Sequence, residues 1–349
     1  SFRFRSWKVN RYFCTRIYTA MDFRTRVNIS KPNFEIGHST KMMLSGSCFS
    51  ENIGNKLRKS KFRVKVNPFG IVYNPLSVAT VIRRLLSNKY FDESDLVFHN
   101  DVYQSFLHHG SFSHPNKDIC LRNISESFAD ATVFIQETDI FLITFGTAYV
   151  YRLKSTGEVV ANCHKFLPDT FTRERLTVEE IVEEWSEIIS LILKHNPSAK
   201  FIFTVSPIRH WKDGAHENQI SKSILHLAIE KLHNKFESAL VYFPAYEILL
   251  DELRDYRFFA EDMMHPSPVA IDYIWQLFCE TFFSKRTIDI TREWQQLKQS
   301  LNHRPLNEGI NSHYQFLKQT LQKLIVFQNN YPQVDCNQEI ELLKEKTKR

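Results

Sequence analysis

The chain has 349 residues, of which 43% are hydrophobic and 24% charged, and these proportions are ordinary for a soluble globular protein. Its net charge of +6 is spread over the whole length, without a dense stripe of basic residues and interleaved aromatics, so we expect no nucleic-acid partner. No window approaches ~18 uninterrupted apolar residues, and we expect no membrane span.

Short apolar runs alternate with helical patterns over the first 283 residues. Ser50 is an N-cap residue type, and Asn74 stands before Pro75, which suits the first position of a helix. The predicted strands are 41–46, 63–70 (running into a turn), 139–146, a hairpin within 146–166, 199–207 and 239–246. The predicted helices are 50–62, 74–88, 125–139, 177–195, 216–236 and 267–283, and the segment 89–124 has no regular pattern.

Strands separated by helices predict a parallel sheet with helices on both faces. In such sheets ligands bind at the carboxyl ends of the strands. Four unusual stretches directly follow predicted strands, namely 46–48, 67–70, 146–148 and 206–210. Their shared position predicts a single active site at that edge of the sheet.

The two ends of the chain differ from this core pattern. Residues 1–20 are basic and aromatic, without the apolar block of a signal peptide, and the first methionine is Met21. We expect 1–20 to be a disordered or non-native extension. Residues 286–349 are expected to form a helical extension that ends in a charged, solvated tail. The six cysteines form no C-x-x-C pair, which favours reduced thiols in a cytoplasmic protein.

Asp262 and His265 stand three residues apart before a predicted helix. On a turn, this spacing lets the carboxylate bond one imidazole nitrogen and leaves the other nitrogen free to act as a base. An N-capping aspartate beside a surface histidine has the same spacing, so the pair alone does not decide between the two interpretations.

Cys48 follows a glycine and a serine at the start of a predicted helix. There the helix dipole is expected to lower the pKa of the thiol and make it nucleophilic. The alternative is a small buried cysteine, with Ser47 bonded to the backbone. Gly70 and Gly146 could present N–H groups to a developing oxyanion, or be ordinary turn glycines.

Further polar side chains follow the strands and could hold an anionic or polyhydroxyl substrate, or be helix caps and solvated charges. They are Asn162, His164, Lys165, Arg209, His210, Lys212, Asn218 and Ser221. Cys48, Cys163, His164 and His265 could together ligate zinc, but they lack the paired spacing of zinc ligands. A thiol-ligated metal site is therefore a weaker alternative, and we expect no metal and no other cofactor.

Together these stretches resemble the GSCFA family. They run in order from about residue 22 to residue 283 as GSCFSENIGNKL, NPFGIVYNP, ITFGTAYVY, ANCHK, TVSPIRHWKDG, ENQISKS, YFPAYEILLDELRDYRFFAEDMMHPS and AIDYIW. The family in turn resembles the SGNH or GDSL hydrolases, which are three-layer α/β/α proteins with a parallel, flavodoxin-like sheet and which cleave esters. The resemblance implies a domain of this kind over 21–285 and a helical C-terminal extension over 286–349.

The resemblance also implies roles for particular residues. Cys48 lies over the nucleophilic serine of the first hydrolase block, and Ser47 is the minority candidate for that role. Asp262 and His265 match the Asp-x-x-His block. The third block, Gly-x-Asn, reads Gly146-Thr147-Ala148, so the side-chain oxyanion donor of those enzymes is missing, and Thr147 and Asn162 are the candidate replacements.

The sequence therefore predicts an esterase or acyltransferase that acts on ester-linked acyl groups, with saccharide esters suggested by analogy of fold. Cys48, His265 and Asp262 are the expected catalytic residues. The expected oxyanion donors are Gly70, Gly146, Thr147 and the amide of Cys48. The expected substrate-binding residues are Ser47, Asn162, His164, Lys165, Arg209 and Asn218. Because the Gly-x-Asn asparagine is missing, the alternative is a non-catalytic binding or scaffold protein on a degenerate SGNH fold. The oligomeric state stays open.

Overall fold

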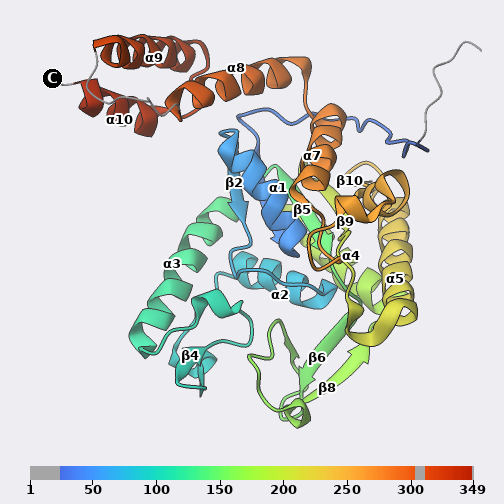
Figure 1. The fold of residues 1–349 in the computed structure, drawn as a ribbon. Coiled ribbons are helices and arrows are strands. Elements are labelled where there is room, and N and C mark those ends of the chain that lie inside the picture. The colour runs from blue at the N-terminus through green and yellow to red at the C-terminus, as the bar shows by residue number, and fades with distance from the viewer. Residues whose placement is uncertain (1–23, 303–310, 348–349) are drawn as a thin grey trace, which may run out of the picture.

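A five-stranded parallel sheet forms the centre of the computed structural model, which describes residues 24–302 and 311–347 (Figure 1). Its strands are β1 (Lys41–Gly46), β2 (Arg63–Val66), β5 (Ile140–Phe145), β9 (Lys200–Val205) and β10 (Leu240–Tyr242). They lie in the order β10-β9-β5-β1-β2. Numbered along the chain, this order is 2-1-3-4-5, which is the flavodoxin-like order, so the predicted fold class is confirmed. The expectation for residues 1–20 lies outside the described residues.

Helices cover both faces of this sheet, as predicted for strands that are apolar throughout. All six residues of β5 are buried. Successive side chains alternate between the two faces: Met43 packs in one core and Met42 and Leu44 pack in the other. The first core includes α2 (Pro75–Leu86), α3 (Lys117–Ile135), α4 (Val178–His195) and α5 (Gly214–Lys235). The second includes α1 (Cys48–Lys59), α6 (Ala245–Glu247), the π-helix Ile248–Leu253 and α7 (Pro268–Phe282).

A smaller antiparallel sheet of β6 (Tyr149–Leu153), β7 (Val159–Val160) and β8 (Phe171–Arg175) follows β5. The hairpin of β6 and β7 was predicted, whereas β8 was not. A second small pair, β3 (Val97–His99) and β4 (Val102–Gln104), lies in the segment predicted as irregular. The prediction that α3 starts at residue 125 is wrong, because the Asn116 side chain accepts from the amide of Ile119 and caps the helix earlier.

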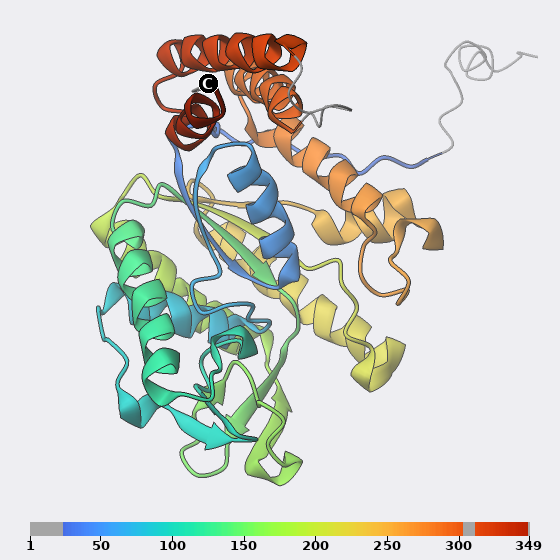
Figure 2. The ribbon, with the colours of Figure 1, turned by 60° about the vertical axis from the view of Figure 1, so that its left-hand side comes forward.

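The C-terminal extension forms three helices, α8 (Lys285–Leu301), α9 (Asn311–Asn330) and α10 (Asn337–Thr347), around a core of their own. It packs at the last turn of α1, where Trp294 Nε1 donates to the Lys59 carbonyl at 2.9 Å. Figures 1 and 2 both place it at the opposite end of the molecule from β6 and β8. The predicted solvated tail is wrong for the described part of the chain, because α10 buries Ile340 and Leu343. None of the helices in the described ranges is long and apolar enough to cross a membrane.

The turn from β1 into α1 depends on Gly46. Its φ is +138°, and a Cβ there would come 2.2 Å from the backbone oxygen of Thr144, so a side chain is excluded both by strain and by contact. The turn places Ser47 at the N-cap, where its Oγ accepts from the Phe49 amide at 3.2 Å. The helix therefore begins at Cys48 rather than after Ser50, whose hydroxyl instead donates to Thr144 Oγ1 at 2.6 Å.

Candidate active site

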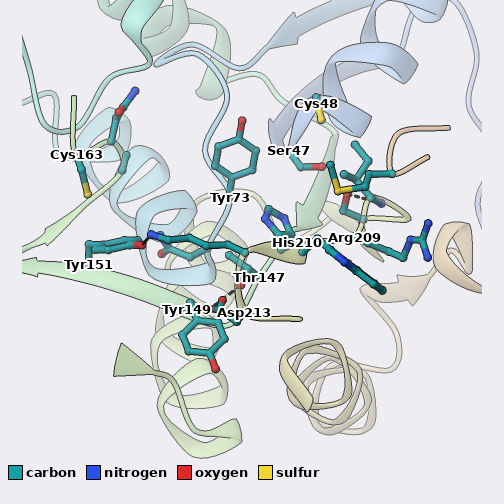
Figure 3. A pocket seen from close by; sticks show the side chains of 18 of the residues that line it. Ser47, Cys48, Tyr73, Thr147, Tyr149, Tyr151, Cys163, Arg209, His210 and Asp213 are labelled. Atoms are coloured by element: carbon teal, nitrogen blue, oxygen red, sulfur yellow. Dashed lines mark hydrogen bonds between the residues drawn. The ribbon is translucent and has the colours of Figure 1, made fainter. Parts of the chain in front are cut away.

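A cavity of about 600 Å³ lies at the carboxyl ends of the central strands. Ser47 and Cys48 line it after the end of β1, and Thr147 lines it after the end of β5 (Figure 3). Ser206, which follows β9, lines it as well. Three of the four stretches that the sequence placed at this edge therefore line one cavity. The fourth, 67–70, does not line it.

Cys48 is the first residue of α1 and its partly buried side chain faces the cavity. Burial raises the pKa of the thiol above its ordinary value. The amides of Cys48 and Phe49 and the charge of Lys222 act in the opposite direction, and Glu51 adds to the increase. The expected lowering by the helix N-terminus is thus present, but the prediction of a lowered pKa is wrong because burial outweighs it.

Ser47 lies beside Cys48, but its side chain is only 1% exposed and its oxygen caps α1. A hydroxyl that accepts from a helix amide is held in the turn and is not aimed freely at a ligand. The two neighbouring residues therefore have different surroundings, and the thiol is the more accessible of the two.

His265 borders the same cavity, and its Nδ1 donates to Asp262 Oδ2 at 2.5 Å. The other carboxylate oxygen accepts from the amides of His265 at 2.9 Å and Met264 at 3.0 Å. These hydrogen bonds lower the pKa of Asp262 to about 2, so that its carboxylate stays ionised and fixes the ring. Within the described residues, the remaining ring nitrogen of His265 makes no hydrogen bond.

The expected backbone oxyanion donors already have acceptors in the protein. The Gly70 amide donates to the Asn67 carbonyl at 2.8 Å, and Gly70 does not line the cavity. The amides of Gly146 and Thr147 both donate to the Tyr73 carbonyl, at 2.7 and 3.1 Å. An N–H that is bonded inside the protein is not free for an oxyanion, which argues against these three amides as donors. The Thr147 hydroxyl, the candidate replacement for the missing asparagine, lies 3.2 Å from the Ser221 hydroxyl and accepts from the Tyr149 amide at 3.1 Å.

Tyr73 is a cavity residue that the sequence reasoning missed. Its ring meets His210 edge-on, with the ring centroids 5.6 Å apart. Burial, and after it the charge of Cys48, raise the pKa of the Tyr73 phenol, so the hydroxyl keeps its proton and remains a donor. Figure 3 shows its side chain on the side of the cavity where Cys48 and Ser47 lie. The sequence signal that could have pointed to Tyr73 is its position directly before Asn74, the N-cap of α2.

Lys222 of α5 was also missed, and it is fully buried. Its Nζ donates to the carbonyls of Gly146 and Ser206, both at 2.7 Å, and so joins the ends of β5 and β9. Burial lowers its pKa to about 7, against the opposing effect of Cys48. In the sequence, Lys222 stands three residues before Leu225 and seven before Ile229, so helical periodicity places it on the apolar face of α5. That spacing could have predicted its burial.

The predicted substrate-binding residues divide into two groups. Asn162 and Arg209, like Ser47, line the cavity. The other three do not line it. His164 is buried, with its Nε2 2.8 Å from the Ser105 carbonyl oxygen, and Lys165 is exposed to solvent outside the cavity. The Asn218 side chain accepts a hydrogen bond from the His210 amide at 2.9 Å. We therefore assign no substrate contact to these three.

The wall formed by β6, β8 and the turn after β9 adds aromatic and charged groups. The Arg173 guanidinium lies 3.9 Å from the ring centroid of Tyr149 and is paired with Asp213. Lys212 Nζ donates to the Tyr151 hydroxyl at 2.7 Å. In the part of the chain that the structure describes, no group of three or more histidines, cysteines and carboxylates is placed to hold a metal ion.

Comparison with protein-family models shows which family the chain belongs to. The model of the GSCFA family matches residues 41–278, from the first strand to α7. The chain belongs to the GSCFA family. A second model, described as the C-terminal domain of GSCFA domain proteins, matches residues 294–349 and so covers most of the helical extension.

Solved structures similar to this GSCFA chain include three carbohydrate esterases. An acetyl xylan esterase from Butyrivibrio proteoclasticus is 13% identical, with a TM-score of 0.35 over 70% of this chain and 63% of its own. A family 3 carbohydrate esterase from Clostridium thermocellum is 12% identical, with a TM-score of 0.31, and the match covers 72% of this chain and 97% of the esterase. A family 3 carbohydrate esterase from Talaromyces cellulolyticus is 9% identical, with a TM-score of 0.33, and the match covers 73% of this chain and 99% of the esterase. These likenesses are remote. A search of curated proteins finds no match.

The buried Lys222 should leave a signature in the pH dependence of stability. Its folded pKa of about 7 lies below the ordinary value of 10.5, so its burial destabilises the fold fully below pH 7 and progressively less as the pH rises toward 10.5. We expect the free energy of unfolding of the wild type to rise relative to Lys222→Met between pH 7 and 9. Urea unfolding of both proteins at each pH measures this, and parallel curves for the two proteins would contradict it.

Proposed function

We propose that this protein is an esterase or acyltransferase that acts on ester-linked acyl groups, with Cys48 as its nucleophile. The observation that carries the proposal is that one cavity is lined by Cys48 and by His265, whose Nδ1 is held by Asp262 at 2.5 Å. A nucleophile, a base and a group that orients the base are what acyl transfer through a covalent intermediate requires. Cys48 and His265 are not hydrogen-bonded to each other here, and such contacts often tighten only when substrate is bound.

The reaction proceeds in two halves. His265 Nε2 takes the proton of the Cys48 thiol as the sulfur attacks the ester carbonyl carbon. The tetrahedral intermediate collapses to a thioester, and the alcohol leaves with the proton from the imidazolium. In the second half His265 removes a proton from water or from an acceptor alcohol, which attacks the thioester and regenerates the thiol. The ionised carboxylate of Asp262 stabilises the imidazolium in both halves.

The oxyanion requires donors other than the occupied glycine amides. We assign this role to the Tyr73 hydroxyl, which makes no hydrogen bond within the described residues and faces the cavity, together with the Cys48 amide in the first turn of α1. Asn162 is a further donor, because its Oδ1 accepts from the His164 amide while its Nδ2 has no partner among the described residues.

We propose a saccharide ester as the substrate, in a reducing cytoplasmic setting. The support for a sugar is the cavity wall, where the aromatic faces of Tyr149, Tyr151 and Trp211 stand beside the polar groups of Arg173 and Lys212. Such a mixture of flat apolar surface and a few donors suits a polyhydroxyl ring. The support for the setting is the nucleophile, because a thiol must stay reduced to attack an ester.

A non-catalytic binding protein is the second candidate. It is favoured by the occupied amides of Gly70, Gly146 and Thr147 and by the burial that raises the pKa of Cys48. In that case the cavity binds a ligand, the thiol reacts no faster than an ordinary cysteine, and no ester is turned over.

Replacement of Cys48 separates the two candidates. We expect Cys48→Ala to lower kcat/KM for p-nitrophenyl acetate by at least about 10³-fold, because the covalent route is lost. Cys279→Ala, on α7 outside the cavity, should leave turnover unchanged. Rates come from p-nitrophenolate absorbance.

Iodoacetamide labelling, mapped by mass spectrometry, accompanies these rates. Burial alone would slow the reaction of Cys48, so labelling that is faster in the wild type than in His265→Ala would identify His265 as the base. Ser47→Ala should lose about 1 kcal/mol of stability with its cap while Cys48 still labels rapidly. Full turnover by Cys48→Ala together with an inactive Ser47→Ala would contradict the assignment. Absence of turnover with slow labelling in the wild type would favour the binding protein.

Tyr73→Phe removes one hydroxyl and tests the oxyanion assignment. We expect kcat to fall about 10²- to 10³-fold, as for the loss of one oxyanion donor, with a small change in KM. Tyr90→Phe is the matched control, because Tyr90 is 53% exposed and lies outside the cavity. A Tyr73→Phe enzyme with the wild-type kcat would exclude the phenol as a donor.

A further inference from the structure

The turn that carries Asp262 and His265 is shaped by hydrogen bonds within its own loop, residues 254–267. Besides the bonds to the Asp262 carboxylate, the Met263 amide donates to the Ala260 carbonyl at 2.9 Å, and the Ala260 amide donates to the His265 carbonyl at 2.8 Å. All of these bonds join residues that are close in the sequence. They fix the form of the turn, but they do not fix its place relative to the central sheet, from which the thiol enters the cavity.

The turn is also open to solvent, so packing restrains it little. The side chains of Asp262 and His265 are 41% and 50% exposed, and Met263 between them is 48% exposed. Met263 has a φ of +56°, in the left-handed region that a residue with a side chain adopts at a cost in free energy. Such a conformation persists only where the surrounding structure holds it, so the turn requires a contact from outside its own loop.

Arg209, in the turn after β9, makes this contact. Its Nη2 donates to the carbonyl of Met263, the residue with the left-handed backbone. The same guanidinium lies 4.9 Å from the ring centroid of Phe259 and 5.8 Å from that of Tyr256, both in the loop, and 5.0 Å from that of Trp211 in its own segment. A charged donor strengthens the hydrogen bond, and the aromatic faces attract the cation. One side chain therefore contacts the loop at its turn and at the segment before it.

Arg209 borders the cavity, but its donors are directed at the protein. Nη2 bonds the Met263 carbonyl, and Nε is buried without a hydrogen-bond partner among the described residues. Two of the three guanidinium nitrogens are therefore engaged or enclosed by protein, and the planar fork that would hold an anionic substrate is not presented to the cavity. Figure 3 shows Arg209 on the side of the cavity away from Tyr151 and Cys163.

We propose that Arg209 is a positioning residue that holds the turn of Asp262 and His265 against the carboxyl end of β9. Because β9 and β1 are joined through β5 in one sheet, a bond from the turn after β9 to this loop also fixes the loop relative to Cys48. Arg209 acts through His265 and touches no reacting atom. The inference rests on the proposed function, in which His265 is the base, but the contact itself exists without a substrate.

Hydrogen exchange of the loop tests the contact without any ester. Wild type, Arg209→Met and Arg257→Met are exchanged in parallel, and peptides from 256–267 and from α7 are followed by mass spectrometry. Arg257 is the matched control, because its guanidinium lies 5.0 Å from the Phe258 ring centroid in the same loop but does not border the cavity. We expect Arg209→Met to speed exchange in 256–267 by at least about tenfold, as for the loss of one charged hydrogen bond, with α7 unchanged. Wild-type exchange of this segment in Arg209→Met would overturn the proposal.

Steady-state kinetics with p-nitrophenyl acetate tests the consequence for the reaction. We expect kcat of Arg209→Met to fall about 10²-fold with little change in KM, because a displaced His265 costs rate rather than binding. Arg209→Lys keeps a charged donor for the Met263 carbonyl and should recover part of the lost kcat and slow the loop exchange again. A wild-type kcat in Arg209→Met, or a raised KM alone, would overturn the positioning role. Faster loop exchange in Arg209→Met without any turnover by the wild type would support the contact and contradict the esterase.

Discussion

The parallel hydrogen bonding of β1 to β5 and of β5 to β9 is the constraint on which the site depends. It brings three strand ends to one edge, so the residues after each strand meet although they are about a hundred and sixty positions apart, from Cys48 to Ser206. Gly46 makes the departure from β1 abrupt enough for α1 to begin at Cys48. Lys222 then joins the ends of β5 and β9, because its buried Nζ donates to the carbonyls of Gly146 and Ser206.

Much of this arrangement follows from local pattern in the sequence. The central strands were predictable because they are buried on both faces, and the start of α2 because Asn74 and Pro75 carry a clear N-terminal signal. The pairing of Asp262 with His265 was predictable because it is a contact between residues three positions apart. The early start of α3 and the strand β8 were missed, since one depends on the Asn116 cap and the other on pairing with β6 across a loop.

The site itself was predictable only in part, because hydrogen-bond occupancy and burial belong to the folded chain. The sequence cannot show that the Gly70 and Gly146 amides already donate to Asn67 and Tyr73. It places a thiol at a helix N-terminus, but the cost of burial, which reverses the sign of the pKa shift, appears only in three dimensions. In the proposed mechanism, the Tyr73 hydroxyl takes the place of the missing asparagine as a side-chain donor, and no local pattern in the sequence pointed to that role.

The account rests on one covalent event, the transfer of an acyl group to Cys48. It is tested most directly by mixing the wild-type protein with p-nitrophenyl acetate, quenching in acid within a single turnover, and mapping the added acetyl group by peptide mass spectrometry. The account predicts one acetyl group on Cys48, held as a thioester that hydroxylamine removes. An acetyl group on Ser47, or release of p-nitrophenol without any acetylated peptide from α1, would contradict it.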